Sequence, residues 1–170
     1  MAGLDVSRLS PNDAVNALRS YPRRYRGVLT SFEKDEKPDD LVYRAGADGR
    51  SAVEHADHAA RAVALGGEAL RQVMTQHEPV IQKAVIDDSA RDWTMDGTDD
   101  VETVLGFLTS ECETLADQVA RVDASLWNRA ATVAGSGRRV TALDIARDAV
   151  KAGGDHLRAA EAAIDHARHN

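Results

Sequence analysis

The chain has 170 residues, of which 28 are acidic and 21 are basic, so its formal net charge is −7. This acidic balance argues against a nucleic-acid-binding protein, because such proteins present a basic face. No apolar run is long enough to span a membrane and no signal-peptide pattern is present, so we expect a cytoplasmic protein without a membrane partner. The length suits a single domain over residues 1–170.

The composition favours an all-α fold. Alanine is abundant, whereas aromatic residues make up 4 % of the chain and only four prolines occur. Alanine is the best helix former, and strands prefer the β-branched and aromatic residues that are scarce here.

Four segments combine apolar residues at three- and four-residue spacing with helix-start signals such as Ser10 and the Ser51/Glu54 capping box. We expect helices near residues 11–32, 51–77, 99–122 and 141–166. Four amphipathic helices of this length predict a four-helix bundle. The connections 33–50, 78–98 and 123–140 are long for such a bundle. Segment 78–98 is long enough to run back along it, which predicts parallel second and third helices, and a short helix is expected at Val80–Ile86.

Proline and glycine residues mark special positions inside these helices. Pro22 is expected to kink or interrupt the first helix. The pair Gly66-Gly67 predicts either a bend in the second helix or the close approach of another backbone. The pair Gly153-Gly154 in the last helix has two interpretations, close helix packing or room for a ligand.

Nucleophile motifs based on serine or cysteine, phosphate-binding glycine loops and the His-Glu-x-x-His zinc motif do not occur in the sequence. The single cysteine excludes an internal disulfide and a multi-cysteine zinc site. Because Cys112 lies on the apolar stripe of the third helix, we expect it to be buried and not catalytic. Trp93 and Trp127 fall in connections, where each is able to cover the core or to line a cleft.

The histidines are the remaining candidates for chemistry. His55 and His58 are three residues apart on the second helix and share part of one face. His156 lies on the fourth helix, with Asp148 two turns earlier on a similar face. Imidazoles from facing helices are able to form a divalent metal site in a bundle core, and the alternative is solvated histidines on helix surfaces.

The order of these features resembles the DinB-like superfamily, in particular the branch of the mycothiol-dependent maleylpyruvate isomerases. The resemblance covers most of the chain. It is carried by LRSYPRRY at 18–25, AGADGRSAVEHAD at 45–57, LWNR at 126–129, GRRVT at 137–141 and the helix from Leu143 to Ile164. It implies a DinB-like four-helix bundle with long crossover connections.

The family binds a divalent metal through three histidines, one from the second helix and two at H-x-x-x-H spacing on the last. The resemblance therefore implies His55 and His156 as ligands of a zinc or nickel ion. The third ligand position falls on Ala152, which has no donor atom, so the site is degenerate. Asp148 or Asp155 would be the substitute ligand in a set of two histidines and one carboxylate.

The resemblance also implies an activity. In such a family the metal lowers the pKa of a low-molecular-weight thiol such as mycothiol, which gives a thiol-dependent transferase or isomerase acting on a small molecule. Trp127 is the candidate cofactor-binding residue, on the view that it lines a cleft with His55 and His156. The departure at Ala152 leaves an alternative, a metal-free bundle that binds a small molecule or is purely structural, as a monomer or homodimer.

Overall fold

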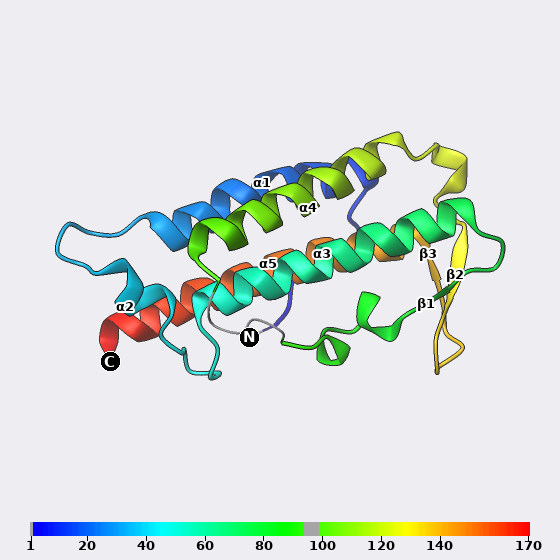
Figure 1. Ribbon diagram of the computed structural model, residues 1–170. Coiled ribbons are helices and arrows are strands. Elements are labelled where there is room, and N and C mark those ends of the chain that lie inside the picture. The colour runs from blue at the N-terminus through cyan, green and yellow to red at the C-terminus, as the bar shows by residue number, and fades with distance from the viewer. Residues whose placement is uncertain (1, 94–98) are drawn as a thin grey trace.

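The computed structural model describes residues 2–93 and 99–170 (Figure 1). Four long helices pack lengthwise and confirm the predicted helical bundle. They are α1 (Pro11–Thr30), α3 (Ala52–Thr75), α4 (Val101–Arg121) and α5 (Ala142–His169). Ser10, Ser51 and Thr141 form capping boxes at three of the helix starts, and Asp100 caps α4, so the amide groups of each first turn are satisfied.

The C-terminal end of the first helix differs from the prediction. Helix α1 ends at Thr30, and the connection after it contains a short helix α2 (Pro38–Val42). Pro22 does not interrupt α1. Tyr21 and Tyr25, on either side of it, donate their hydroxyl protons to the carbonyls of Val150 and Gly153 on α5. These buried hydrogen bonds hold both halves of α1 against the same neighbour.

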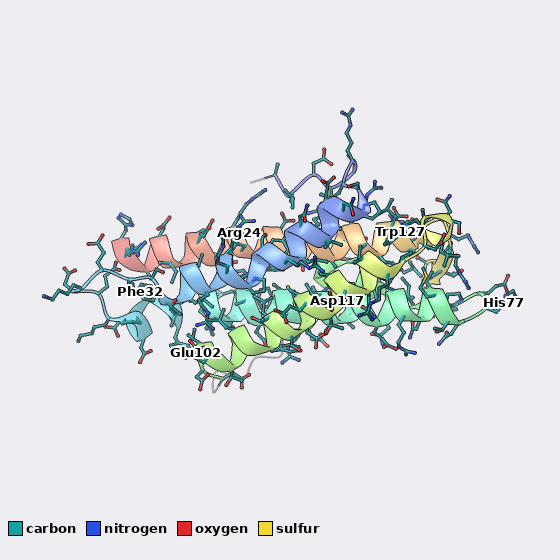
Figure 2. All side chains as sticks on the ribbon, turned by 90° about the horizontal axis from the view of Figure 1, so that it is seen from above. Arg24, Phe32, His77, Glu102, Asp117 and Trp127 are labelled. Carbon is teal, nitrogen blue, oxygen red and sulfur yellow. The ribbon has the colours of Figure 1, made fainter. Side chains whose placement is uncertain are left out.

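The long helices run in two directions (Figure 1). Helices α3 and α4 point the same way, and α1 and α5 point the opposite way. Two exposed ion pairs, Arg19–Asp117 and Arg26–Glu102, reflect the antiparallel packing of α1 on α4; Figure 2 labels both carboxylates. After α3 the chain turns back along the bundle, so that residues 87–93 lie beside the N-terminal half of α3.

The prediction of an all-α fold is wrong in one respect, because three short strands form a small sheet. Strands β1 (Val80–Ile81), β2 (Ala130–Val133) and β3 (Arg139–Thr141) follow that order, β1 parallel and β3 antiparallel to β2. The expected helix at Val80–Ile86 is replaced by β1 and a 3-10 turn at Lys83–Val85. Strands of two to four residues are too short to show a periodicity in the sequence.

The core confirms the prediction for Cys112, whose side chain is fully buried. The glycine pair Gly153-Gly154 serves close packing. A Cβ atom on Gly153 would lie 2.4 Å from the ring of Tyr21, so the absence of a side chain lets α1 approach α5. Gly66 plays the same part on α3, where a Cβ would lie 3.1 Å from that of Ala149. Among the described residues, no helix has the length and apolar character that crossing a membrane requires.

Candidate metal centre

The structure brings His55 and His156 together between α3 and α5. Their Nδ1 atoms are 3.0 Å apart, and both side chains are buried. His55 lies in the first turn of α3, directly after the Ser51 cap. The preceding loop, which turns at Gly49 with φ 83°, places Asp48 Oδ2 2.9 Å from His55 Nε2. The two histidines therefore face one space, as the sequence predicted.

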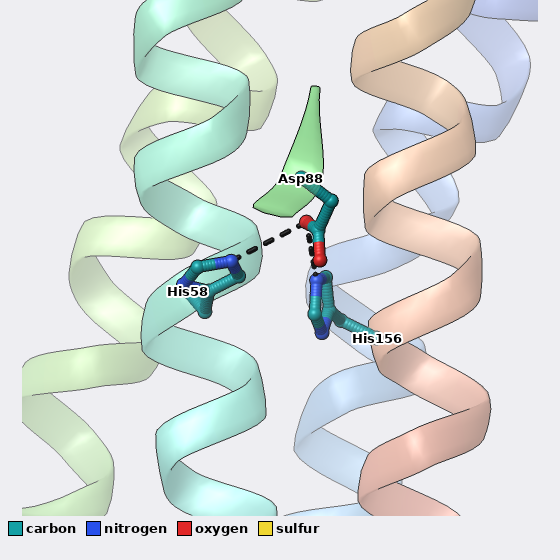
Figure 3. A group of neighbouring side chains, drawn as sticks. All are labelled: His58, Asp88 and His156. Atoms are coloured by element: carbon teal, nitrogen blue, oxygen red, sulfur yellow. Dashed lines mark hydrogen bonds and ion pairs between the residues drawn. The ribbon is translucent and has the colours of Figure 1, made fainter. Parts of the chain in front are cut away.

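Three groups that are able to bind a metal ion converge at this place, and His156 is one of them (Figure 3). Asp88 Oδ1 lies 2.8 Å from His156 Nε2 and 3.3 Å from His58 Nε2. One ligand atom from each of His58, Asp88 and His156 lies within 4.8 Å of the other two. The donors come from α3, from the connection after β1 and from α5.

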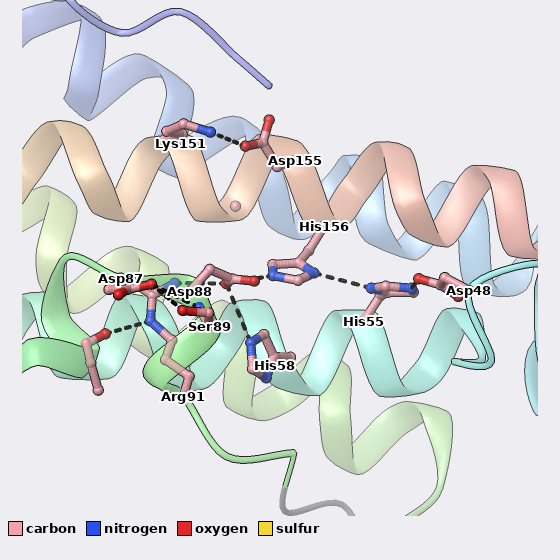
Figure 4. A network of polar contacts seen from close by, with 12 residues as sticks. Asp48, His55, His58, Asp87, Asp88, Ser89, Arg91, Lys151, Asp155 and His156 are labelled. Carbon is pink, nitrogen blue, oxygen red and sulfur yellow. Dashed lines mark hydrogen bonds and ion pairs between the residues drawn. The ribbon is translucent and has the colours of Figure 1, made fainter. Parts of the chain in front are cut away.

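Arg91 fixes the position of Asp88 (Figure 4). Its guanidinium group is buried and donates to Asp88 Oδ1 at 2.8 Å. The same group donates to the carbonyls of Ala84 and Val85 at 2.6 and 2.9 Å, which closes the connection into a compact loop. The Asp88 carboxylate is thus held in place by its own segment.

Burial and neighbouring charges shift the pKa values of two groups of the site, His55 and Asp88. Burial lowers the pKa of His55 below its usual value, against the opposing effect of Asp48, so the imidazole is neutral at neutral pH. Burial alone would raise the pKa of Asp88, but contacts with His156 and His58 outweigh it and place that pKa well below its usual range. Asp88 is therefore an ionised carboxylate.

The hydrogen-bond chain from Asp48 through His55 and His156 to Asp88 needs more protons than two neutral imidazoles supply. Three contacts along this chain each need one, whereas two neutral imidazoles carry only two. If Asp48 accepts from His55 Nε2, then His55 Nδ1 accepts from His156, and the lone pair of His156 Nε2 faces the Asp88 carboxylate. Only an extra proton or a metal cation makes that last contact attractive.

His58 is a second buried histidine whose hydrogen-bonding groups are not satisfied. Its side chain is 1 % exposed, and neither ring nitrogen makes a hydrogen bond with a described residue. Leaving a buried polar group unpaired costs on the order of 1–3 kcal/mol. The residues present therefore fit a divalent ion, because such an ion would bind a buried imidazole that makes no hydrogen bond with the described residues.

The aromatic wall of the site is Trp93, not Trp127. The Trp93 ring stacks on His58 at 3.9 Å and meets His55 edge-on, and Arg50 lies 4.6 Å from its centre. Trp127 packs in the core beside the sheet, at the far end of the molecule (Figure 2). The prediction that Trp127 lines a cleft with the histidines is wrong, because the segment after α4 stays at the sheet end of the bundle.

A cavity of about 500 Å³ adjoins the histidines. Its described lining residues are Asp48, His55, Ile86, Asp87, Asp88, Arg91, Trp93, Asp148, Lys151, Ala152, Asp155, His156 and Ala159. Ala152 thus lies on the face of α5 that the sequence assigned to it. The predicted substitute ligands also line the cavity, but neither belongs to the group of three donors.

The two candidate substitutes have different surroundings. Asp155 accepts from Lys151 and from the backbone amide of Leu4, so its carboxylate is already paired. Burial raises the pKa of Asp148 to about 6. Sequence reasoning missed Asp88, which lies in a connection without periodicity. It counted His58 among the histidines able to form a metal site, but the resemblance then implied His55 as the ligand from that helix.

A comparison with solved structures finds the same architecture in YfiT from Bacillus subtilis, described as a probable metal-dependent hydrolase with an unusual four-helix bundle topology. The match has a TM-score of 0.70, covers 92 % of this chain and 87 % of YfiT, and has 13 % identical residues. No family model and no curated protein matches the sequence. The likeness shows the four-helix-bundle fold and nothing beyond it.

Proposed function

We propose that this protein binds a divalent transition-metal ion through His58, Asp88 and His156 and acts on a small molecule in the adjoining cavity. The observation that carries the proposal is the buried imidazole of His58, which makes no hydrogen bond with any described residue and lies 3.3 Å from an ionised carboxylate. Two imidazoles and one carboxylate are a donor set that zinc and nickel accept.

Other residues of the site support these donors. With Asp48 accepting from His55 Nε2, His55 Nδ1 accepts from His156 Nδ1, and His156 Nε2 is left unprotonated and able to bind the metal. A second hydrogen bond fixes the tautomer of a metal-binding histidine in this way. Arg91 holds the Asp88 carboxylate. Trp93 covers His58 and excludes water from its ring. The implication that His55 itself binds the metal stays a prediction. The variants described below distinguish His55 as a direct ligand from His55 as a residue that orients His156.

The chemistry follows from the ion. When bound, such an ion lowers the pKa of a water or thiol ligand and so supplies a nucleophile at neutral pH. The description of YfiT as a probable metal-dependent hydrolase favours water as that nucleophile. The resemblance to the mycothiol-dependent isomerases favours a thiol, and with it a transferase or isomerase. Both reactions use the same three donors.

The test of the proposal is zinc and nickel affinity, measured by competition with a chromophoric chelator. We expect one ion per chain in the unmodified protein and a loss of more than about 100-fold in His58→Ala and in His156→Ala. His55→Ala should lose only about 10- to 100-fold, as for a residue that orients a ligand. His77→Ala is the matched control, because His77 is an exposed histidine at the far end of α3.

Two results contradict the proposal. Unmodified protein that binds no zinc or nickel favours the metal-free alternative. A loss in His55→Ala as large as in His156→Ala, with none in His58→Ala, favours His55 as the direct ligand.

For the loaded protein, release of p-nitrophenol from p-nitrophenyl esters without thiol indicates a hydrolase, and turnover of an electrophile only with added thiol indicates a transferase or isomerase.

A further inference from the structure

The wall of the cavity is strongly acidic. Five carboxylates line it, those of Asp48, Asp87, Asp88, Asp148 and Asp155. The cationic side chains that line it are those of Arg91 and Lys151. Both cations are already engaged. Arg91 donates to Asp88 and to two backbone carbonyls, and Lys151 pairs with Asp155. Apart from a bound metal ion, an anionic ligand would find no uncommitted cation among the described lining residues.

Four of the five carboxylates have partners within the protein. Asp48 contacts His55, Asp87 accepts from Ser89, Asp88 contacts His156 and Asp155 accepts from Leu4. Asp148 is the exception, since no described residue donates a hydrogen bond to it or forms an ion pair with it. This half-buried carboxylate loses hydration, and the charges of Arg91, Arg138 and Lys151, which form no ion pair with it, only partly offset that loss. Burial accordingly raises the pKa of this group to about 6, and it is ionised at pH 7.5.

Asp148 also faces the metal centre along one helix. Asp148, Ala152 and His156 are four residues apart on α5, so they project from one face, and all three line the cavity. The eight helical steps from Asp148 to His156 span roughly 12 Å of helix. The small side chain of Ala152 leaves the space between them open to a ligand.

We propose that Asp148 binds a cationic group of the substrate, so that the cavity takes a small molecule with an ammonium or similar group at one end and its reacting group at the metal. This substrate class rests on the proposed function, whereas the binding of a cation by Asp148 does not require the ion. An ammonium group would supply the hydrogen bonds and the ion-pair contact that the Asp148 carboxylate lacks among the described residues.

The test compares three probes of equal chain length, pentylamine, 1-pentanol and pentanoate. Their affinities are measured at pH 7.5 by ¹⁵N–¹H NMR titration of the whole protein, with and without zinc. We expect pentylamine to bind at least about tenfold more tightly than 1-pentanol in both states. Pentanoate should bind the zinc-free protein most weakly. The amide signals that shift should be those of residues 148–156.

Asp148→Asn should abolish the preference for the amine and leave zinc affinity unchanged. Asp148→Glu should retain it, which guards against a folding effect of the first variant. Asp165→Asn is the matched control, an exposed aspartate on the same helix. Equal binding of amine and alcohol by the unmodified protein, or a preference that survives Asp148→Asn, overturns the inference. An amine preference in a protein that binds no zinc contradicts the metal proposal and leaves this one standing.

Discussion

Helix α5 presents two contrasting faces within two turns. Toward α1, Gly153 lies against the ring of Tyr21, where a Cβ atom would approach to 2.4 Å. Toward α3, the same stretch presents Asp148, Ala152 and His156 to a cavity of about 500 Å³. Both faces use small residues, yet one is filled by a neighbouring side chain and the other is left open.

The polar groups of the two faces differ in the same way. On the α1 side, both tyrosine hydroxyls donate to backbone carbonyls of α5, and burial raises the pKa of Tyr21 and of Tyr25 above the usual value. On the α3 side, His58 has no hydrogen bond and Asp148 has no partner among the described residues. Satisfied polar groups stabilise a fold, whereas unsatisfied ones in the interior require an explanation, here the ion and the ligand that we propose.

The largest effect on the packed face is expected from Gly153→Ala. The added methyl group would overlap Tyr21, whose hydroxyl is fixed to Val150, so neither helix yields cheaply. We expect a loss of about 3 kcal/mol in the free energy of unfolding, measured by urea denaturation. Gly27→Ala on α1 is the control, because nothing lies within 4 Å of that position, and it should gain about 0.5–1 kcal/mol. Equal effects of the two changes would refute the close packing.

Cys112→Ser tests the apolar core that Tyr21 and Tyr25 share with α4. Cys112 is fully buried, and burial raises its pKa to about 12. A hydroxyl group in that place should cost about 2 kcal/mol of unfolding free energy. The unmodified thiol should react with Ellman's reagent only after denaturation, and rapid reaction of the native protein would contradict its burial.

Ala152→His probes the open face. Residues 152 and 156 project together into the cavity, so the new imidazole would join His156 at the ion. We expect zinc affinity to rise by about tenfold or more, which is about 1.4 kcal/mol. The gain should disappear when His156 is also changed to Ala. A folded variant without any gain would mean that α5 does not present these two positions to one ion.

Asp148→Asn probes the carboxylate of the same face through the pH dependence of stability. The pKa of Asp148 is about 6 in the folded protein and 3.8 in an unperturbed chain. The folded state therefore binds the proton more tightly, and the ionised group costs stability as pH rises from about 4 to 6. The variant should be more stable than the unmodified protein by about 1 kcal/mol at pH 7.5 and equal to it at pH 3.5. A difference in unfolding free energy that stays constant across this pH range would show that the ionised Asp148 carboxylate does not destabilise the fold.

The sequence predicted the parts of the fold that depend on local signals. Ser10, Ser51 and Thr141 cap helices near the expected positions, and Cys112 follows the apolar stripe of its helix into the core. The small sheet was missed because its strands span two to four residues, which gives no usable alternation.

The site was predictable only in its helical half. The resemblance to the DinB-like superfamily placed His55 and His156 at one site, and their positions on regular helices permitted it. The structure brings their Nδ1 atoms within 3.0 Å of each other. Asp88 and Trp93 lie in an irregular connection whose path depends on tertiary contacts such as those of Arg91. The prediction that Trp127 lines the cleft failed because Trp127 also lies in a connection. A sequence does not show which end of a bundle a connection covers.

The most direct test of the account is the anomalous diffraction of crystals grown with one equivalent of zinc. A peak should lie between His58, Asp88 and His156, with each donor atom about 2.0–2.2 Å from the ion. His55 should remain hydrogen-bonded to His156 outside the coordination sphere. An ion bound by His55 without His58, or no ordered zinc between α3 and α5, would contradict the account.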